Sequence, residues 1–191
     1  RSLSGLIPAA INPKRAKDFQ STPETAKRLR RVGAPRPITT ATTRGNPMKT
    51  VHVLNGPNLN LLGTREPSTY GTATLKDIEA ALQKKAKAAK VRLVFRQTNR
   101  EGELVDWIHE AGAANAGILL NAGAYTHTSI ALHDAIRATG VTVVELHLSN
   151  VFARESFRHH SYISPVAKGV ICGFGAASYE LAFDALLPHL A

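Results

Sequence analysis

The sequence has 191 residues, enough for one domain with a full hydrophobic core, and carries a formal net charge of +10. Residues 1–47 contain ten Lys and Arg but only two acidic residues, whereas residues 48–191 contain fourteen Lys and Arg and twelve acidic residues. This distribution argues against a uniformly basic nucleic-acid-binding protein. A membrane-spanning helix is not expected, since no apolar run approaches ~18 residues, nor is a disulfide framework, since Cys172 is the only cysteine.

Residues 1–47 differ in composition from the rest of the chain. They hold six of the ten prolines and are rich in Ser, Thr and Arg, without a sustained hydrophobic period. We interpret them as a basic, proline-rich leader: either a non-native extension ahead of a natural start at Met48, the only methionine, or an organelle-targeting segment. A nucleic-acid-binding arm is the least favoured interpretation, because the cationic run at 27–31 contains no aromatic residue to stack on bases.

From Met48 onward, strand and helix patterns alternate. Short runs of apolar and β-branched residues predict strands at 50–54, 91–97, 117–121, 141–147 and 170–173. Apolar residues at helical spacing predict helices at 74–90, 101–113, 128–139 and 176–190. The alternation predicts an α/β fold for residues 48–191: a flavodoxin-like three-layer sandwich around a five-stranded parallel sheet with strand order 2-1-3-4-5. In such sheets, ligands bind beyond the carboxyl ends of the strands.

The connection after the first strand is unusually long. Residues 55–70 read NGPNLNLLGTREPSTY, where a βα connection ordinarily spans about two to six residues. Long loops of this kind are often functional, and Arg65 and Tyr70 are close enough in sequence for the guanidinium to contact the phenol. A free tyrosine ionises near pH ~10, and a neighbouring cation is the usual source of the roughly 4 kcal/mol that would make it a base at neutral pH. We therefore expect a lid that brings an Arg-activated tyrosine to a substrate.

Polar side chains follow the strands at the expected ligand-binding edge. They are Asn55 and Asn58 after the first strand, Asn121 and residues 123–127 after the third, and His147, Ser149, Asn150, Arg154 and Arg158 after the fourth. Such donors, acceptors and cations suit a small polyhydroxylated carboxylate. Glu145 and His147 are two apart on a strand and so share one face. A carboxylate beside an imidazole favours its protonated, proton-donating form; a purely structural ion pair is the alternative.

Common nucleotide and metal motifs are absent from the sequence. There is no GxxxxGK[ST], and the GFG run at 173–175 follows the last strand, where a dinucleotide fingerprint does not belong. Because HExxH and clustered cysteines are also missing, no metal is expected. We expect His52, His109 and His189 to be partly exposed structural residues.

Three stretches resemble one family in order and spacing. Residues 54–71 (LNGPNLNLLGTREPSTYG), 119–136 (LLNAGAYTHTSIALHDAI) and 145–164 (ELHLSNVFARESFRHHSYIS) are similar to type II 3-dehydroquinate dehydratase, the dehydroquinase of the shikimate and quinate routes. The resemblance covers residues 48–191 and leaves the leader unmatched. It implies a hydro-lyase without metal or organic cofactor that converts 3-dehydroquinate reversibly to 3-dehydroshikimate, by anti elimination through an enolate.

The resemblance also implies residue roles. Tyr70 matches the base with Arg65 beside it, and His147 matches the acid that protonates the departing hydroxyl. Glu145 would orient His147, and Asn58 would hold a water that stabilises the enolate. The implied substrate-binding residues are Asn121, His127, Leu148, Ser149, Arg158, Asp134 and Arg154. Among these, the amides of Leu148 and Ser149 would hold the substrate carboxylate, Arg154 would be a second cation near the base, and Asp134 would reach the neighbouring subunit's site.

The implied assembly is a homo-dodecamer, a tetramer of trimers. We expect it in the cytoplasm, or in an organelle if residues 1–47 are a transit peptide, with neither nucleic acid nor membrane as a partner. The sequence leaves open whether the route served is biosynthetic, toward chorismate and aromatic amino acids, or catabolic. The rival hypothesis is a non-catalytic flavodoxin-like module that binds an anion, which would need the polar strand ends but neither Tyr70 nor His147.

Overall fold

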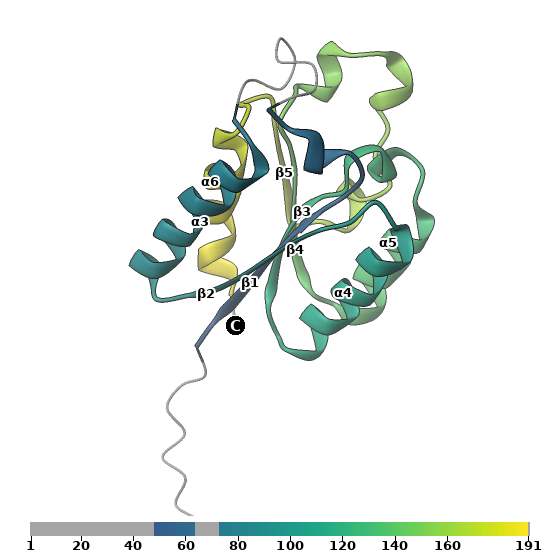
Figure 1. Ribbon diagram of the computed structural model, residues 1–191. Helices are drawn as coiled ribbons and strands as arrows, with labels where there is room; N and C mark the ends of the chain where they lie inside the picture. Colours follow the sequence, from purple (N-terminus) through teal and green to yellow (C-terminus); the bar gives the residue numbers. More distant parts are fainter. Residues whose placement is uncertain (1–47, 64–72, 191) are drawn as a thin grey trace, which may run out of the picture. The chain divides into compact units, whose positions relative to one another are not determined.

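A computed structural model of the protein describes residues 48–63 and 73–190 (Figure 1). In this part of the chain one sheet is formed by β1 (Thr50–Asn55), β2 (Arg92–Gln97), β3 (Gly117–Asn121), β4 (Thr142–His147) and β5 (Gly169–Cys172). All neighbouring strands are parallel, in the order β2-β1-β3-β4-β5. The predicted α/β fold and strand order are confirmed.

Helices cover both faces of the sheet, as Figure 1 shows. The helices are α3 (Leu75–Ala89) and α6 (Ala177–Leu186) on one face, and α4 (Glu101–Ala113) and α5 (Ile130–Thr139) on the other. Because successive strand residues point to opposite faces, Val53 of β1 packs in the α3/α6 core while the next residue, Leu54, packs in the α4/α5 core. Strand β3 is buried along its whole length, as expected for the centre of a parallel sheet.

Local sequence sets the helix ends. Thr74 caps α3 through a capping box, in which its side chain accepts from the Asp77 amide while the Asp77 side chain accepts from the Thr74 amide. The helix predicted over 128–139 begins only at Ile130, because Ser129 accepts from the Leu132 amide as its N-cap and a 3₁₀ turn precedes it. The closing helix ends earlier than predicted, at Leu186, and continues as a 3₁₀ turn that contains a proline.

His52 differs from its expected placement as a partly exposed residue. It lies on β1 with only 3 % of its surface accessible, on the face covered by α4 and α5. Its Nδ1 is the only buried side-chain nitrogen or oxygen in the described residues without a hydrogen-bond partner. Burial lowers the pKa of this imidazole, with Arg96 acting in the same direction and Glu110 opposing it. The side chain is therefore neutral at pH 7 and serves as part of the core.

None of the helices in the described ranges is both long and apolar enough to cross a membrane. The two hydrophobic cores lie on either side of the sheet, and the polar side chains gather beyond the carboxyl ends of β1, β3 and β4.

Candidate active site

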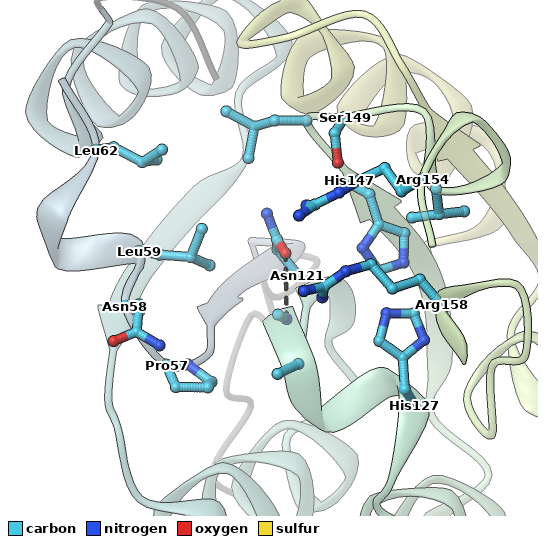
Figure 2. Close-up of a pocket in the computed structure, with 14 residues that line it drawn as sticks. Pro57, Asn58, Leu59, Leu62, Asn121, His127, His147, Ser149, Arg154 and Arg158 are labelled. Carbon is cyan, nitrogen blue, oxygen red and sulfur yellow. Dashed lines mark hydrogen bonds between the residues drawn. The ribbon is translucent and has the colours of Figure 1, made fainter. Parts of the chain in front are cut away.

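A cavity of about 130 Å³ opens at the carboxyl edge of the sheet. Its walls come from the segments that directly follow β1, β3 and β4. Figure 2 shows Asn58, Leu59 and Leu62 on one side, a cluster of histidines and arginines on the other, and Asn121 between them. This is where the expected topology placed the ligand site.

Most of the sequence-predicted site residues in the described ranges line this cavity. They are Asn58, Asn121, His127, His147, Leu148, Ser149, Arg154 and Arg158. Glu145 lies behind the cavity, in contact with His147. Asp134 is exposed on α5 and does not line the cavity, and Arg65 and Tyr70 lie outside the described residues.

Two arginines give the cavity a cationic wall. Arg158 donates from Nε to Glu155 at 2.9 Å, and the Nε of Arg154 lies 3.5 Å from the same oxygen. The guanidinium of Arg158 also lies over the Phe157 ring, 5.0 Å from its centroid. Because one carboxylate faces two guanidiniums, the cluster keeps a net positive charge and favours an anionic ligand.

His127 presents a hydrogen-bond acceptor to the cavity. Its Nδ1 lies 2.7 Å from the carbonyl oxygen of His160. A carbonyl only accepts, so Nδ1 carries the proton and Nε2 of the neutral ring can accept. Burial lowers the pKa of His127, and the nearby His147 and Arg158 lower it further. A neutral ring in this tautomer suits a ligand hydroxyl.

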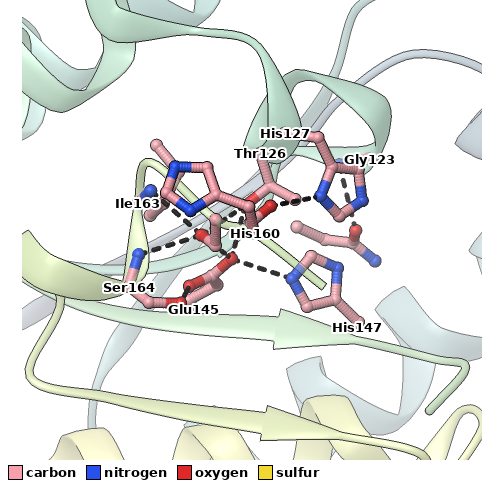
Figure 3. Close-up of polar contacts among 10 residues, drawn as sticks. Gly123, Thr126, His127, Glu145, His147, His160, Ile163 and Ser164 are labelled. Atoms are coloured by element: carbon pink, nitrogen blue, oxygen red, sulfur yellow. Dashed lines mark hydrogen bonds and ion pairs between the residues drawn. The ribbon is translucent and has the colours of Figure 1, made fainter. Parts of the chain in front are cut away.

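Glu145 and His147 form a buried pair on β4. The His147 Nε2 lies 2.9 Å from Glu145 Oε1, and the Glu145 side chain is inaccessible to solvent. Three hydroxyls contact the carboxylate: those of Thr126 and Ser161 donate to Oε1, and that of Ser164 donates to Oε2. Figure 3 shows Thr126, Ser164 and His147 around Glu145. Burial is the largest single influence and raises the pKa of Glu145, but the bonds from His147, Ser164 and Thr126 outweigh it and lower that pKa below its usual value.

A second buried network holds Asn121 from the other face of the sheet. The Asn121 side chain donates to the Tyr179 hydroxyl at 2.9 Å, and that hydroxyl donates to Asn55 Oδ1 at 2.6 Å. The Asn121 Oδ1 accepts from the amide of Gly123 at 3.3 Å. With its oxygen and one N–H engaged, the Asn121 amide is fixed with one N–H left for a ligand.

The first wall of the cavity follows β1. Asn58 adopts a left-handed backbone conformation with φ of 66°, and its amide donates to Asn99 Oδ1 at 2.9 Å. Leu59 and Leu62 are buried and give this wall its apolar surface. The left-handed turn, which Asn tolerates better than most residues, directs the chain into the 3₁₀ turn that carries Leu59.

Sequence reasoning missed the residues that support the site from behind. Each of these residues lies 16 or more positions in sequence from the site residue that it supports, Asn121 for Tyr179 and Glu145 for Thr126, Ser161 and Ser164. Only Thr126 falls within a stretch that strand-end reasoning singled out. Within the described ranges, three or more His, Cys, Asp or Glu side chains nowhere lie together as metal ligands would. The expected absence of a metal stays a prediction.

These features define an α/β enzyme of the flavodoxin-like type, whose carboxyl-edge cavity combines an imidazole–carboxylate pair with a cationic wall. The sequence model of the family described as dehydroquinase class II matches residues 49–187. The chain belongs to that family, and the predicted family and enzyme class, a hydro-lyase, are confirmed.

Named relatives support the assignment. The chain is 67 % identical over 137 residues to the 3-dehydroquinate dehydratase of Azorhizobium caulinodans, covering 72 % of this chain and 92 % of the relative. It is 64 % identical over 138 residues to the 3-dehydroquinate dehydratase of Brucella canis, covering 72 % and 88 %. The crystal structure of type II dehydroquinase from Propionibacterium acnes superposes with a TM-score of 0.71 at 41 % identity, covering 73 % of this chain and 97 % of that structure.

Proposed function

We propose that the protein dehydrates 3-dehydroquinate reversibly to 3-dehydroshikimate. The observation that carries this proposal is the buried Glu145–His147 pair beside a cavity with two arginines, in a chain of the dehydroquinase class II family. The substrate is a small carboxylate with several hydroxyls, which matches the cationic wall and the acceptor on His127.

The proposed reaction is an anti elimination through an enolate. Tyr70, made acidic by Arg65, takes the proton α to the ketone, and the C–H electron pair moves into the enolate. A water held by Asn58 stabilises the enolate oxygen. The enolate then collapses to the conjugated enone, and the C–O bond breaks as His147 gives its proton to the departing hydroxyl, which leaves as water.

The remaining cavity residues bind and orient the substrate in this proposal. The backbone amides of Leu148 and Ser149 hold the carboxylate, with Arg154 as a second cation near the base. Asn121, His127 and Arg158 hold the ring substituents. The geometry supports these roles because every one of these residues lines the same cavity.

We also propose a homo-dodecamer in the cytoplasm that serves the shikimate or quinate route. Asp134 supports such an assembly because it is exposed on α5, away from the cavity of its own chain, and so is available to a neighbouring subunit. Phe152, Phe157 and Phe174 are each about two-thirds exposed, as expected for side chains that pack between subunits. Light scattering after size exclusion tests the assembly: a monomer would contradict it.

The proposed activity is tested by following the absorbance of the conjugated enone formed from 3-dehydroquinate. Tyr70→Phe should abolish turnover while the protein stays folded and still binds the substrate-like quinate. Tyr162→Phe, which removes a tyrosine hydroxyl outside the cavity lining, is the matched control and should turn over normally. Near-normal rates in Tyr70→Phe would reject the assigned base, and a chelator-sensitive rate would contradict the metal-free reaction.

The rival binding module is tested by the same samples. It would bind quinate, yet the unmodified protein would form no enone at any pH. Removing residues 1–47 should leave the rate unchanged if the enzyme is the functional part, and should destroy function if the leader is.

A further inference from the structure

We propose that Thr126, Ser161 and Ser164 are positioning residues for the acid His147, acting through Glu145. Their three hydroxyls contact the Glu145 carboxylate, and we call these three residues the cage. In this proposal the cage fixes which nitrogen of the His147 imidazole faces the cavity. The inference rests on the proposed function, because it assigns how the acid of that reaction is held.

Proton counting fixes the direction of the bonds in the cage. The Ser161 Oγ accepts from the amides of Ile163 and Ser164, both at 3.0 Å, so its acceptor positions are occupied. Its single proton is therefore given to Glu145 Oε1, at 2.9 Å. The Thr126 hydroxyl, 3.0 Å from Ser161 Oγ, finds no acceptor position there and gives its proton to the same carboxylate oxygen.

The cage leaves Glu145 as an acceptor only. Three hydroxyls donate to the two carboxylate oxygens, two of them to Oε1, which also lies 2.9 Å from His147 Nε2. A hydrogen on either carboxylate oxygen would point toward these hydroxyl donors, so the cage selects the ionised form although the side chain is fully buried.

The ionised carboxylate in turn selects the tautomer of His147. Since Glu145 can only accept, His147 Nε2 must carry a proton, and Nδ1 is the nitrogen that Glu145 does not hold. In the charged ring Nδ1 bears the second proton, which is the one available to a departing hydroxyl. Loss of a cage hydroxyl would let Glu145 rotate or take up a proton, and the ring could then turn or exchange tautomers.

The segment that carries two cage hydroxyls is fastened to the loop and helix that follow β3. The amide of Tyr162 donates to the Thr126 carbonyl at 2.8 Å. His127 Nδ1 donates to the His160 carbonyl and His133 Nδ1 to the Tyr162 carbonyl, both at 2.7 Å. These bonds hold the 160–164 segment against the 3₁₀ turn that carries Thr126, so the hydroxyls are placed by the fold rather than by Glu145 alone.

The test compares Thr126→Val, which removes the hydroxyl but keeps the shape, with Thr126→Ser, which keeps the hydroxyl. Thr126→Val should lower kcat about tenfold, the scale of one hydrogen bond to a charged group, with little change in KM.

Thr126→Ser should restore the rate, and Ser164→Ala, which removes the donor to Oε2, should repeat the effect of Thr126→Val. Thr139→Val is the matched control, because its hydroxyl bonds the Ala135 carbonyl within α5 and not the cage. Equal losses in Thr126→Val and Thr126→Ser, or an unchanged kcat in both Thr126→Val and Ser164→Ala, would overturn the proposal.

Nitrogen NMR of the histidine rings tests the cage independently of turnover. With ¹⁵N-labelled histidine, and His147 assigned by comparison with His147→Gln, the unmodified protein should show His147 only as the Nε2–H tautomer when neutral. Thr126→Val and Ser164→Ala should show a mixture of tautomers. If the unmodified protein forms no enone but shows a single His147 tautomer, and the two variants show a mixture, the proposed function is refuted while the role of the cage stands. If the unmodified protein already shows a mixture of tautomers, the role of the cage is refuted.

Discussion

Replacing Tyr179 by Phe should weaken both the fold and substrate binding. The Tyr179 hydroxyl is fully buried, accepts from Asn121 at 2.9 Å and donates to Asn55 at 2.6 Å. Burial raises the pKa of this hydroxyl, so it remains a protonated donor throughout the working pH range. Phe keeps the ring but leaves one donor and one acceptor buried without partners, where each lost bond costs roughly 1 kcal/mol or more. We expect about 2 to 3 kcal/mol of lost stability.

Denaturant unfolding measures this loss directly, as a lower midpoint with an unchanged slope. Asn121 also loses the bond that fixes its amide, so KM for 3-dehydroquinate should rise several-fold while kcat falls less. Tyr125→Phe is the control, because it removes one hydroxyl that bonds the exposed carbonyl of Asn99 at 2.8 Å and should cost less than about 1 kcal/mol. If Tyr179→Phe unfolds at the midpoint of the unmodified protein, or raises KM no more than Tyr125→Phe does, the assigned network is wrong.

Two further predictions concern the core and the cavity wall. Burial lowers the pKa of His52, so as the pH falls the unfolded chain takes up a proton on this imidazole before the folded chain does. The stability contributed by neutral His52 is therefore complete above pH ~6.5, the ordinary pKa of histidine, and is lost as the pH falls through the lower pKa of the folded state. His52→Val should therefore flatten the dependence of unfolding free energy on pH below about pH 6.5. If guanidinium unfolding gives the same dependence of unfolding free energy on pH for both proteins, this prediction is wrong. A Cβ on Gly56 would lie 2.3 Å from the Ala122 carbonyl oxygen, so Gly56→Ala should lower stability by about 1 to 3 kcal/mol or more and displace the cavity wall. Gly102→Ala is the control, because a Cβ there meets no atom within 4 Å and should leave stability unchanged or raise it. Similar thermal unfolding midpoints for the two variants would reject the steric argument.

The fold and the position of the cavity followed from local patterns. A buried parallel strand such as residues 117–121 is a continuous apolar run, and the polar residue that ends it, Asn121, marks the carboxyl edge of the sheet. The same strand-end pattern predicts His127 and Arg158 as cavity residues, and both line the cavity. The two-residue spacing of Glu145 and His147 was equally readable, because strand periodicity alone puts them on one face.

The supporting residues could not be read in this way. Tyr179 lies on a helix whose apolar pattern predicts a core residue, and nothing local shows that its hydroxyl meets Asn55 across 124 positions. Ser161 looks like an ordinary loop serine; its role depends on how the segment folds back onto the turn that follows β3. The prediction that His52 is partly exposed is wrong because it rests on residue type alone: histidine is more often found at partly exposed positions. Strand β1 lies inside the sheet and is buried on both faces, so His52 is buried with it.

The two buried networks approach the cavity from opposite faces of the sheet. Asn121 is held from the α6 side through Tyr179, and His147 from the α5 side through Glu145. Both networks consist of described residues in or beside the core, while Tyr70, the proposed base, belongs to the 55–70 connection. Binding and proton donation thus depend on the core, and proton abstraction depends on a separate segment. Consequently the two tyrosine substitutions should separate cleanly: Tyr70→Phe should remove kcat and spare quinate binding, whereas Tyr179→Phe should act mainly through KM and stability.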